Sequence, residues 1–313
     1  MHSLTLTQLT YIVALDKHRN FSLAAEACHV TQPTLSMQVQ KLEEELGLIL
    51  FDRSERPIAP TKIGARVIAQ ARNVLAEVER LSAIAEQATG EMKGVLRVGI
   101  ISTLAPYLLP LVITPFAERY PRISLVFEEH VAEKITEYLR RDLLDVGLVA
   151  TPVPESGIIE EPLFTEPFVG YVSRSHRLYA KKRITIDDLR PDQVWLMPEG
   201  HCFRDQVTLS LYGGSAPEWS ERAVQFESGN LETLQRLVDR GYGMTVLPWL
   251  AVQGEGSSAP DQVREFEGET PGRTVRLIYA KALVKRHLVE AFARETLKSV
   301  APVLPNGSIL RQP

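Results

Sequence analysis

The sequence predicts an all-α N-terminal module, one long helix, and an α/β domain that fills the rest of the chain. Three observations predict this architecture. A capped helix with a polar face follows a short Ala-rich segment near the N-terminus, an apolar stripe at helical spacing runs from Thr61 to Ala88, and short apolar strands alternate with helices from Val95 onward. Since 313 residues are too many for one small domain, more than one domain is expected.

The N-terminal module centres on residues 29–46, which combine a tight turn with a capped helix start. Thr31 can accept hydrogen bonds from first-turn amides, and Pro33 lacks an amide where none is needed, so a helix is expected to start near Gln32. One face of this helix is apolar, and the other carries hydroxyl and amide groups that suit base edges and phosphates. The residues expected to contact DNA here are Thr31, Gln32, Pro33, Thr34, Ser36 and Gln38.

Neighbouring segments complete a winged helix-turn-helix. Residues 21–28 are short, Ala-rich and capped by Ser22, which predicts the first helix of the pair, and residues 6–15 predict a third helix against which the pair packs. Residues 48–60 lose helical periodicity and are expected to form a small β-wing. The expected phosphate contacts are Arg53, Arg56 and Lys62. The alternative for the helix pair is an ordinary helical hairpin with a structural role. The alternative for Arg53, Arg56 and Lys62 is that each is a solvated surface charge.

Net charge adds no support for DNA binding. The whole chain is formally −4, and residues 1–65 hold about as many acidic as basic side chains, with no basic block. Net charge bears on non-specific affinity, whereas a few well-placed cations can still hold phosphates.

Residues 1–65 resemble the winged helix-turn-helix of LysR-type transcriptional regulators, through the runs at residues 24–27, 31–36 and 46–53. The resemblance implies a regulator rather than an enzyme. Such a regulator binds double-stranded promoter DNA as a homodimer or homotetramer, contacts RNA polymerase, and needs no cofactor. It also implies two α/β lobes with a cleft between them, as in periplasmic binding proteins. The expected domains are the winged helix-turn-helix (1–60), a linker and dimerisation helix (61–88), a hinge (89–94), a two-lobed regulatory domain (95–303) and a disordered tail (304–313).

The apolar stripe from Thr61 to Ala88 supports the role of the linker helix independently of the resemblance. A lone helix cannot bury such a stripe, so pairing with a second copy is expected, and this pairing would hold two DNA-reading heads at a fixed separation. The alternative is a long helix packed on its own domain.

Strands and helices alternate after the hinge, which predicts a parallel sheet. The expected strands are 95–101, 123–128, 145–150, 168–173, 194–197, 224–227, 244–247 and 274–279. The expected helices are 103–120, 132–141, 203–212, 231–240 and 287–299.

Cys202, one of two cysteines, begins a predicted helix beside His201 and two residues before Arg204. A helix N-terminus and two potential cations would lower the pKa of the thiol and favour the thiolate, which attacks peroxides to give a sulfenic acid. The alternative is that Cys202 is an inert small hydrophobe, as most free cysteines are.

The loop around Cys202, with the runs at residues 107–110, 232–234 and 243–248, resembles the OxyR subfamily of LysR-type hydrogen peroxide sensors. The resemblance implies that Cys202 attacks peroxide and that His201, Asp205, Thr103 and Arg273 shape the pocket. Local alternatives are that Asp205 caps the helix or pairs with Arg204, that Thr103 only caps its own helix, and that His201 is a surface residue.

One departure from that subfamily concerns the second, resolving cysteine, whose place is occupied by Leu211. An intramolecular disulfide between these positions is therefore impossible, and Cys28 belongs to the helix-turn-helix, far from Cys202 in the expected fold. The remaining outcomes are a stable sulfenic acid, a mixed disulfide, a crosslink between subunits, or a chain altered at Leu211.

The compartment expected from the sequence is the cytoplasm, because there is no apolar leader, no membrane-spanning run, and little cysteine. No metal-ligand spacing is present. Two other functions stay open: a LysR-type regulator that binds a small anionic metabolite, and a thiol peroxidase.

Overall fold

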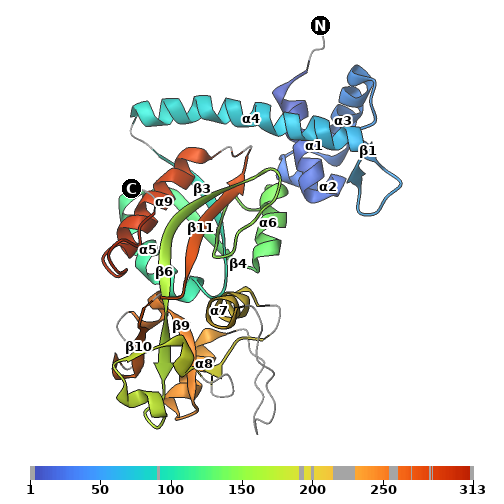
Figure 1. The fold of residues 1–313 in the computed structure, drawn as a ribbon. Coiled ribbons are helices and arrows are strands. Elements are labelled where there is room, and N and C mark those ends of the chain that lie inside the picture. Colours follow the sequence, from blue (N-terminus) through green and yellow to red (C-terminus); the bar gives the residue numbers. More distant parts are fainter. Residues whose placement is uncertain are drawn as a thin grey trace.

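The structure is a computed structural model, and it describes residues 4–89, 92–189, 194–198, 201–213, 230–253, 260–268, 270–281, 283 and 285–310. From the N-terminus to the C-terminus, the structure consists of a helical module, one long helix and a two-lobed α/β body (Figure 1). The expected strand at 224–227 lies outside the described residues, as do residues 90 and 91 of the expected hinge.

The N-terminal module is a winged helix-turn-helix with its own hydrophobic core, which includes Leu35, Val39 and Leu42 from one face of the predicted reading helix. Thr31 caps that helix by accepting a hydrogen bond from the Thr34 amide. The wing strands pair antiparallel. The elements are α1 (Leu6–His18), α2 (Phe21–Ala27), α3 (Gln32–Leu46), β1 (Phe51–Asp52) and β2 (Ala59–Pro60).

The cap of α2 differs from the expectation. Asn20, not Ser22, is the N-cap, and its side-chain oxygen accepts hydrogen bonds from the amides of Ser22 and Leu23 at 2.8 and 3.1 Å. An Asn carbonyl reaches two amides of the first turn, so the helix begins two residues earlier than a Ser22 cap would allow.

Helix α4 (Lys62–Thr89) continues from the wing and runs across the top of the body in Figure 1. Its first half covers the N-terminal core through Ile68 and Ala71, which are buried. Further along, Val74 and Leu81 are exposed. The apolar stripe is thus only partly covered within one chain.

The first lobe is built on a mixed sheet rather than the purely parallel sheet expected. Strand β3 pairs parallel with β4 and β5, whereas β11 pairs antiparallel with β5 and β6. Helices α5 and α9 pack against each other, and α6 packs on β5 and β11. The elements are β3 (Gly94–Ile100), α5 (Ala105–Arg119), β4 (Ile123–Glu129), α6 (Ala132–Arg140), β5 (Val146–Val149), β6 (Ile158–Val172), β11 (Gly272–Ala280) and α9 (Arg286–Val300).

Strand β6 joins the two lobes. Residues 158–167 pair with β11 in the first lobe, and residues 168–172 pair with β9 in the second. The side chains sort accordingly, since Phe164 belongs to the first lobe's core and Phe168 to that of the second. The sequence predicts only residues 168–172 of this strand, and it does not predict β7 (Arg183–Ile184) or β10 (Val263–Phe266).

The second lobe holds the shorter elements. Its helices α7 and α8 cover the sheet formed by β9, β8 and the end of β6. The elements are η1 (Arg177–Ala180), β7 (Arg183–Ile184), η2 (Ile186–Asp188), β8 (Val194–Trp195), α7 (Cys202–Tyr212), α8 (Leu231–Asp239), β9 (Met244–Pro248), η4 (Trp249–Val252), η5 (Pro260–Gln262) and β10 (Val263–Phe266).

The C-terminal segment differs from the expected disordered tail over residues 304–310. The Thr165 amide donates to the Ser308 carbonyl at 2.8 Å, and the Leu310 amide donates to the Leu163 carbonyl at 2.9 Å. Phe164 and Ile309 form an antiparallel bridge. The segment therefore lies along β6 and satisfies backbone groups of that strand.

Candidate functional site

Cys202 is the first residue of α7, at the boundary between the lobes. The helix is anchored in the second lobe by Phe203, Val207 and Leu211, which are buried in its core. From the same helix, the Gln206 side-chain amide donates to the carbonyl of Ala150, the residue that follows β5 in the first lobe, at 2.9 Å. The cysteine thus stands where the lobes touch.

Arg273 lies near this cysteine and is held by hydrogen bonds from all three of its guanidinium nitrogens. Its Nε donates to Glu166 at 2.9 Å, while its terminal nitrogens donate to the hydroxyl and the carbonyl of Thr103, each at 3.1 Å. Glu166 also accepts from the Leu250 amide at 2.7 Å. The side chains of Arg273 and Glu166 are only 1% and 0% exposed, so the pair is held rigidly out of water.

The pKa of Cys202 is shifted in the direction opposite to the one expected from the sequence. Burial raises the pKa of the thiol, and the nearby carboxylates of Glu133 and Asp205 also raise it, whereas Arg273 lowers it. Desolvation penalises the charged form more than one cation favours it. The surroundings of Cys202 as a whole therefore disfavour the thiolate.

The two cations expected from neighbouring residues do not act on the sulfur. Arg204 is buried and donates to the Met197 carbonyl at 3.0 Å. Burial lowers the pKa of His201, which favours the uncharged imidazole. Among the described residues, no hydrogen-bond partner faces the buried Nδ1 of His201.

The structure brings together most of the residues expected for the pocket. Thr103 and Arg273 are in direct contact, and His201 and Cys202 adjoin at the start of α7. Asp205 is exposed, and its carboxylate acts on Cys202 only through its charge. The alternative in which Thr103 merely caps α5 is wrong, because Leu104 is the N-cap and no side-chain cap bond is present there.

Two further residues belong to the site and are missed by sequence reasoning. Glu166 fixes Arg273, and Gln206 ties α7 to the first lobe. The spacing of Gln206, one helical turn after Cys202 on the same face, is a signal that could have found it. No local signal marks Glu166, because its partner is distant in sequence.

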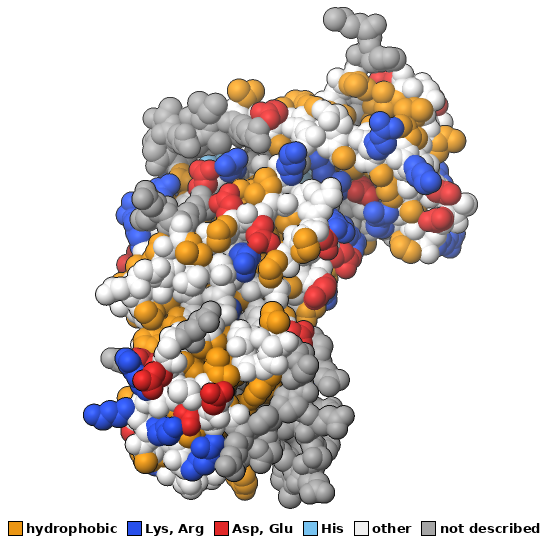
Figure 2. All heavy atoms as spheres, in the orientation of Figure 1, with side chains coloured by type: hydrophobic (Ala, Val, Ile, Leu, Met, Phe, Trp, Pro, Cys, Tyr) orange, Lys and Arg blue, Asp and Glu red, His pale blue; other side chains and the backbone are white. Residues whose placement is uncertain are grey.

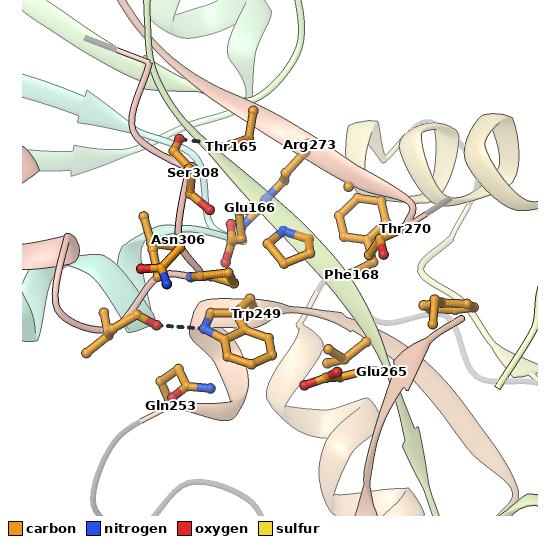
Figure 3. A pocket seen from close by; sticks show the side chains of 18 of the residues that line it. Thr165, Glu166, Phe168, Trp249, Gln253, Glu265, Thr270, Arg273, Asn306 and Ser308 are labelled. Carbon is orange, nitrogen blue, oxygen red and sulfur yellow. Dashed lines mark hydrogen bonds and ion pairs between the residues drawn. The ribbon is translucent and has the colours of Figure 1, made fainter. Parts of the chain in front are cut away.

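A hollow of about 960 Å³ lies on the other side of this network (Figure 3). It is bordered by the strand that joins the lobes, the Trp249 indole and the C-terminal segment, with Asn306 and Ser308. Glu166 and Arg273 line it, but Cys202 does not. Arg273 is thus shared between the hollow and the cysteine site.

The two cysteines belong to separate parts of the molecule. Cys28 packs against the core of the N-terminal module, and Cys202 begins α7 at the lobe boundary. Leu211 is a buried core residue of the second lobe. Among the described residues, no three His, Cys, Asp or Glu side chains are grouped so as to hold a metal ion.

The expected DNA-contacting residues lie at the start of α3 and on the wing. Thr31, Gln32 and Pro33 are exposed, and Thr34, Ser36 and Gln38 are partly exposed. Arg56 is exposed on the wing, whereas Arg53 forms an ion pair with Glu43 at 3.0 Å and lies over the Phe21 ring. On the face in Figure 2, acidic and basic side chains are interspersed over this module, as the sequence indicates.

Comparison with known proteins decides the family. Residues 6–65 match the bacterial regulatory helix-turn-helix protein of the LysR family, and residues 89–301 match the LysR substrate binding domain. The chain belongs to the LysR family. The matched ranges agree with the helical module and the two-lobed body of the structure.

Several relatives of this LysR-family chain carry the OxyR name or function. The hydrogen peroxide-inducible genes activator of Haemophilus influenzae is 33% identical over 96% of this chain and 99% of its own length. A cysteine-to-aspartate variant of full-length OxyR from Pseudomonas aeruginosa matches with a TM-score of 0.76 and 35% identity over 94% of this chain and 97% of that one. A hydrogen peroxide-bound cysteine-to-serine variant of Corynebacterium glutamicum OxyR matches with a TM-score of 0.63 and 28% identity over 98% and 97%.

These relatives are transcription regulators, not enzymes, which agrees with the expectation from the sequence. Within the part of the chain that the structure describes, no helix has the length and apolar character to cross a bilayer.

Proposed function

We propose that this chain is a transcription regulator of the peroxide response, in which hydrogen peroxide oxidises Cys202. The observation that carries the proposal is the Arg273 guanidinium, held beside Cys202 by Glu166 and Thr103. A cation fixed at a partly buried thiol favours the thiolate when the proton leaves, and also favours the negative charge that develops on peroxide. The similarity to peroxide-inducible activators supports the same conclusion.

The proposed chemistry is one two-electron oxidation. The Cys202 sulfur attacks one oxygen of hydrogen peroxide, the O–O bond breaks, and the other oxygen leaves as hydroxide, which takes up the thiol proton to form water. The sulfur is oxidised to sulfenic acid and the peroxide is reduced. The uncharged His201, with its buried Nδ1 lacking a partner among the described residues, offers an acceptor for the proton in transit.

The fate of the sulfenic acid follows from the surroundings of Cys202. A resolving thiol at position 211 is excluded by Leu211, and Cys28 packs in a different core. We therefore propose that the oxidised form is read directly as sulfenic acid or as a mixed disulfide with a small thiol. A thiol peroxidase would need a resolving step that neither cysteine supplies.

The output of the proposed regulator is DNA binding. Gln32, Thr34, Ser36 and Gln38 would read base edges, and Arg56 and Lys62 would hold phosphates. Arg53 is a weaker phosphate candidate because Glu43 already neutralises it. The regulator would act in the cytoplasm as a homodimer or homotetramer bound at a promoter, in contact with RNA polymerase.

The first experiment is oxidation of the reduced protein with limiting hydrogen peroxide, followed by intact mass and a sulfenic-acid probe. We expect rapid, stoichiometric gain of one oxygen atom at Cys202 in the wild type and in Cys28→Ser, and none in Cys202→Ser. Oxidation no faster than that of a free thiol in solution would reject the proposal.

Rejection would leave the metabolite-binding alternative, which predicts thermal stabilisation by a small anion while peroxide is inert. The structure gives that alternative less support. Arg273, the cation lining the hollow, already has Glu166 and Thr103 as partners, so an anion would have to displace one of them.

A further inference from the structure

A charged cluster joins the N-terminal module to the first lobe. Asp142, in the turn after α6, accepts from the Nε of Arg72 on α4 at 2.6 Å. The same guanidinium donates to Asp16 of α1, also at 2.6 Å. The Lys17 ammonium donates to the Asp142 carbonyl. One turn of the lobe therefore contacts both the first helix of the module and the linker helix.

Other charges of the lobe complete this contact. Arg141 donates to the Lys17 carbonyl at 3.4 Å. Burial lowers the pKa of Lys17, with Arg97 also lowering it and Asp142 and Asp145 raising it. The Lys17 ammonium is thus partly withdrawn from water. Because Asp16 and Arg72 are also mostly buried, at 10% and 17% exposed, this cluster is stronger than an exposed ion pair.

The segment that carries this turn also contacts the cysteine site at its other end. The charge of Glu133, in the first turn of helix α6, raises the pKa of the Cys202 thiol, so α6 starts near Cys202. Strand β5 ends at Ala150, whose carbonyl accepts the hydrogen bond from Gln206 of α7. Residues 132–150 therefore join α7 through the hydrogen bond at Ala150, and contact the N-terminal module at the turn. In Figure 1, α6 lies between α7 and that module.

Helix α6 packs closely on the strands beneath it. Ile135 of α6 packs over Gly99 and Gly147 of the neighbouring strands, and a Cβ at Gly147 would approach its side chain to 2.5 Å. With so little free space, α6 cannot shift on the sheet without moving β5 as well. A displacement of α7 at the lobe boundary would be passed to the turn at 141–145.

We propose that the turn at 141–145 docks the DNA-binding module on the first lobe of the same chain, and that oxidation of Cys202 weakens this docking through residues 132–150. The second half of this statement rests on the proposed peroxide response; the first half does not. The docking holds the reading helix in one orientation relative to the body, so its loss would free the two heads of an assembly to change their spacing.

The test is hydrogen–deuterium exchange on the full-length protein, reduced and after stoichiometric oxidation, with Asp142→Asn as the variant. Asp142 has a φ of 53°, a left-handed conformation that Asn adopts readily, so this change removes the charge without straining the turn. Glu290→Gln is the matched control, since Glu290 also pairs with an arginine and is 43% exposed against 42% for Asp142, but lies on α9.

In the reduced protein we expect Asp142→Asn to speed exchange in residues 6–18 and 66–76 by roughly fivefold or more, as for loss of one charge-assisted hydrogen bond. Glu290→Gln should match the wild type, and exchange in residues 95–101 should not change in either variant. Oxidation should speed exchange in the same two segments of the wild type and add little in Asp142→Asn.

Equal exchange in reduced wild type and Asp142→Asn would overturn the docking. Unchanged exchange in wild type whose Cys202 is fully oxidised would overturn the coupling alone. If Cys202 does not react with peroxide at all, the proposed function fails, and the comparison of the reduced proteins still decides the docking.

Discussion

The charge of Arg273 lowers the pKa of Cys202, against burial and two carboxylates that raise it. We predict that Arg273→Met slows oxidation of Cys202 by at least about tenfold at pH 7, the effect of losing about 1.4 kcal/mol of stabilisation. The thiol pKa should rise further, so the rate should recover only at higher pH, where the thiolate forms. Stopped-flow rates across a pH series measure both effects.

The comparison needs a variant in which Glu166 is not left as a lone buried charge, since an unpaired buried charge costs about 3–5 kcal/mol. Glu166→Gln combined with Arg273→Met serves this purpose. Arg174→Met, which removes a cation from an exposed pair, controls for net charge. A pH–rate profile identical to that of the wild type would exclude a role for Arg273.

The raised pKa of Cys202 has a consequence for stability as well. The pKa of Cys202 is higher in the folded chain than in the unfolded chain, so the folded chain binds the thiol proton more tightly. The resulting contribution of Cys202 to the free energy of unfolding is fully present below the unfolded pKa. It is lost as pH rises through the folded pKa, in the alkaline range. We predict that Cys202→Ser flattens this alkaline loss of stability in urea unfolding, and an unchanged pH dependence would contradict the burial of the thiol.

The sequence predicts that Thr103 and Arg273 lie together, and the structure places them in contact, but the pKa of Cys202 is shifted in the direction opposite to the one expected. Arg204 follows Cys202 by two residues, which on a helix places it on the other side, and its guanidinium bonds to Met197 instead. The cation that does act, Arg273, comes from a distant strand. Proximity in sequence is therefore a poor guide to the electrostatics of this site.

Gln32 tests direct reading of bases at the start of α3, because it is exposed and lies in the first turn of the helix. We predict that Gln32→Ala weakens binding to DNA selected by the wild type from a random pool by about 1–3 kcal/mol, while binding to unrelated DNA changes little. Gln40→Ala, further along the exposed side of the helix, is the control. Equal losses on both kinds of DNA would exclude base reading.

At the scale of elements, sequence periodicity predicts helices and strands whose burial pattern is local. It misses strands whose burial depends on a partner far away in the sequence. The α3 helix matches the expectation because its apolar stripe and Thr31 cap are local. The first half of β6 is missed because Pro162 and Pro167 interrupt it and Glu166 looks like a surface residue. The ion pair with Arg273 and the hydrogen bond from the Leu250 amide compensate the burial of this glutamate.

Helix α4 exposes two described members of its apolar stripe, Val74 and Leu81. Leu81 is 69% exposed, beyond the part of the helix that covers the N-terminal core. We predict that Leu81→Glu dissociates the full-length protein toward monomer, because a charge in a helix pair must be desolvated. Sedimentation measures the change, and Gln70→Glu, an exposed polar position on the same helix, should leave assembly intact. If the wild-type protein is itself monomeric, α4 does not form an interface between subunits.

At the scale of the whole molecule, the chain is organised as separate cores joined by a few long elements. Each core was expected from the alternation of elements or from the family resemblance. The joints were not, because β6 passes between the lobes and the C-terminal segment returns to it from over 130 residues away in sequence. These connections between the cores depend on contacts between residues far apart in the sequence, which leave no periodic pattern in the local sequence.

The C-terminal segment tests one of these joints directly. We predict that a chain ending at Val303 is less stable by about 3–5 kcal/mol, because it loses the buried Leu304 side chain and leaves the Thr165 amide and the Leu163 carbonyl without their hydrogen-bond partners. For a body of this size the melting temperature should fall by roughly 10 °C. A chain ending at Leu310 keeps both hydrogen bonds and should melt like the full chain, whereas equal melting of all three chains would show that the segment contributes nothing to the stability of the body.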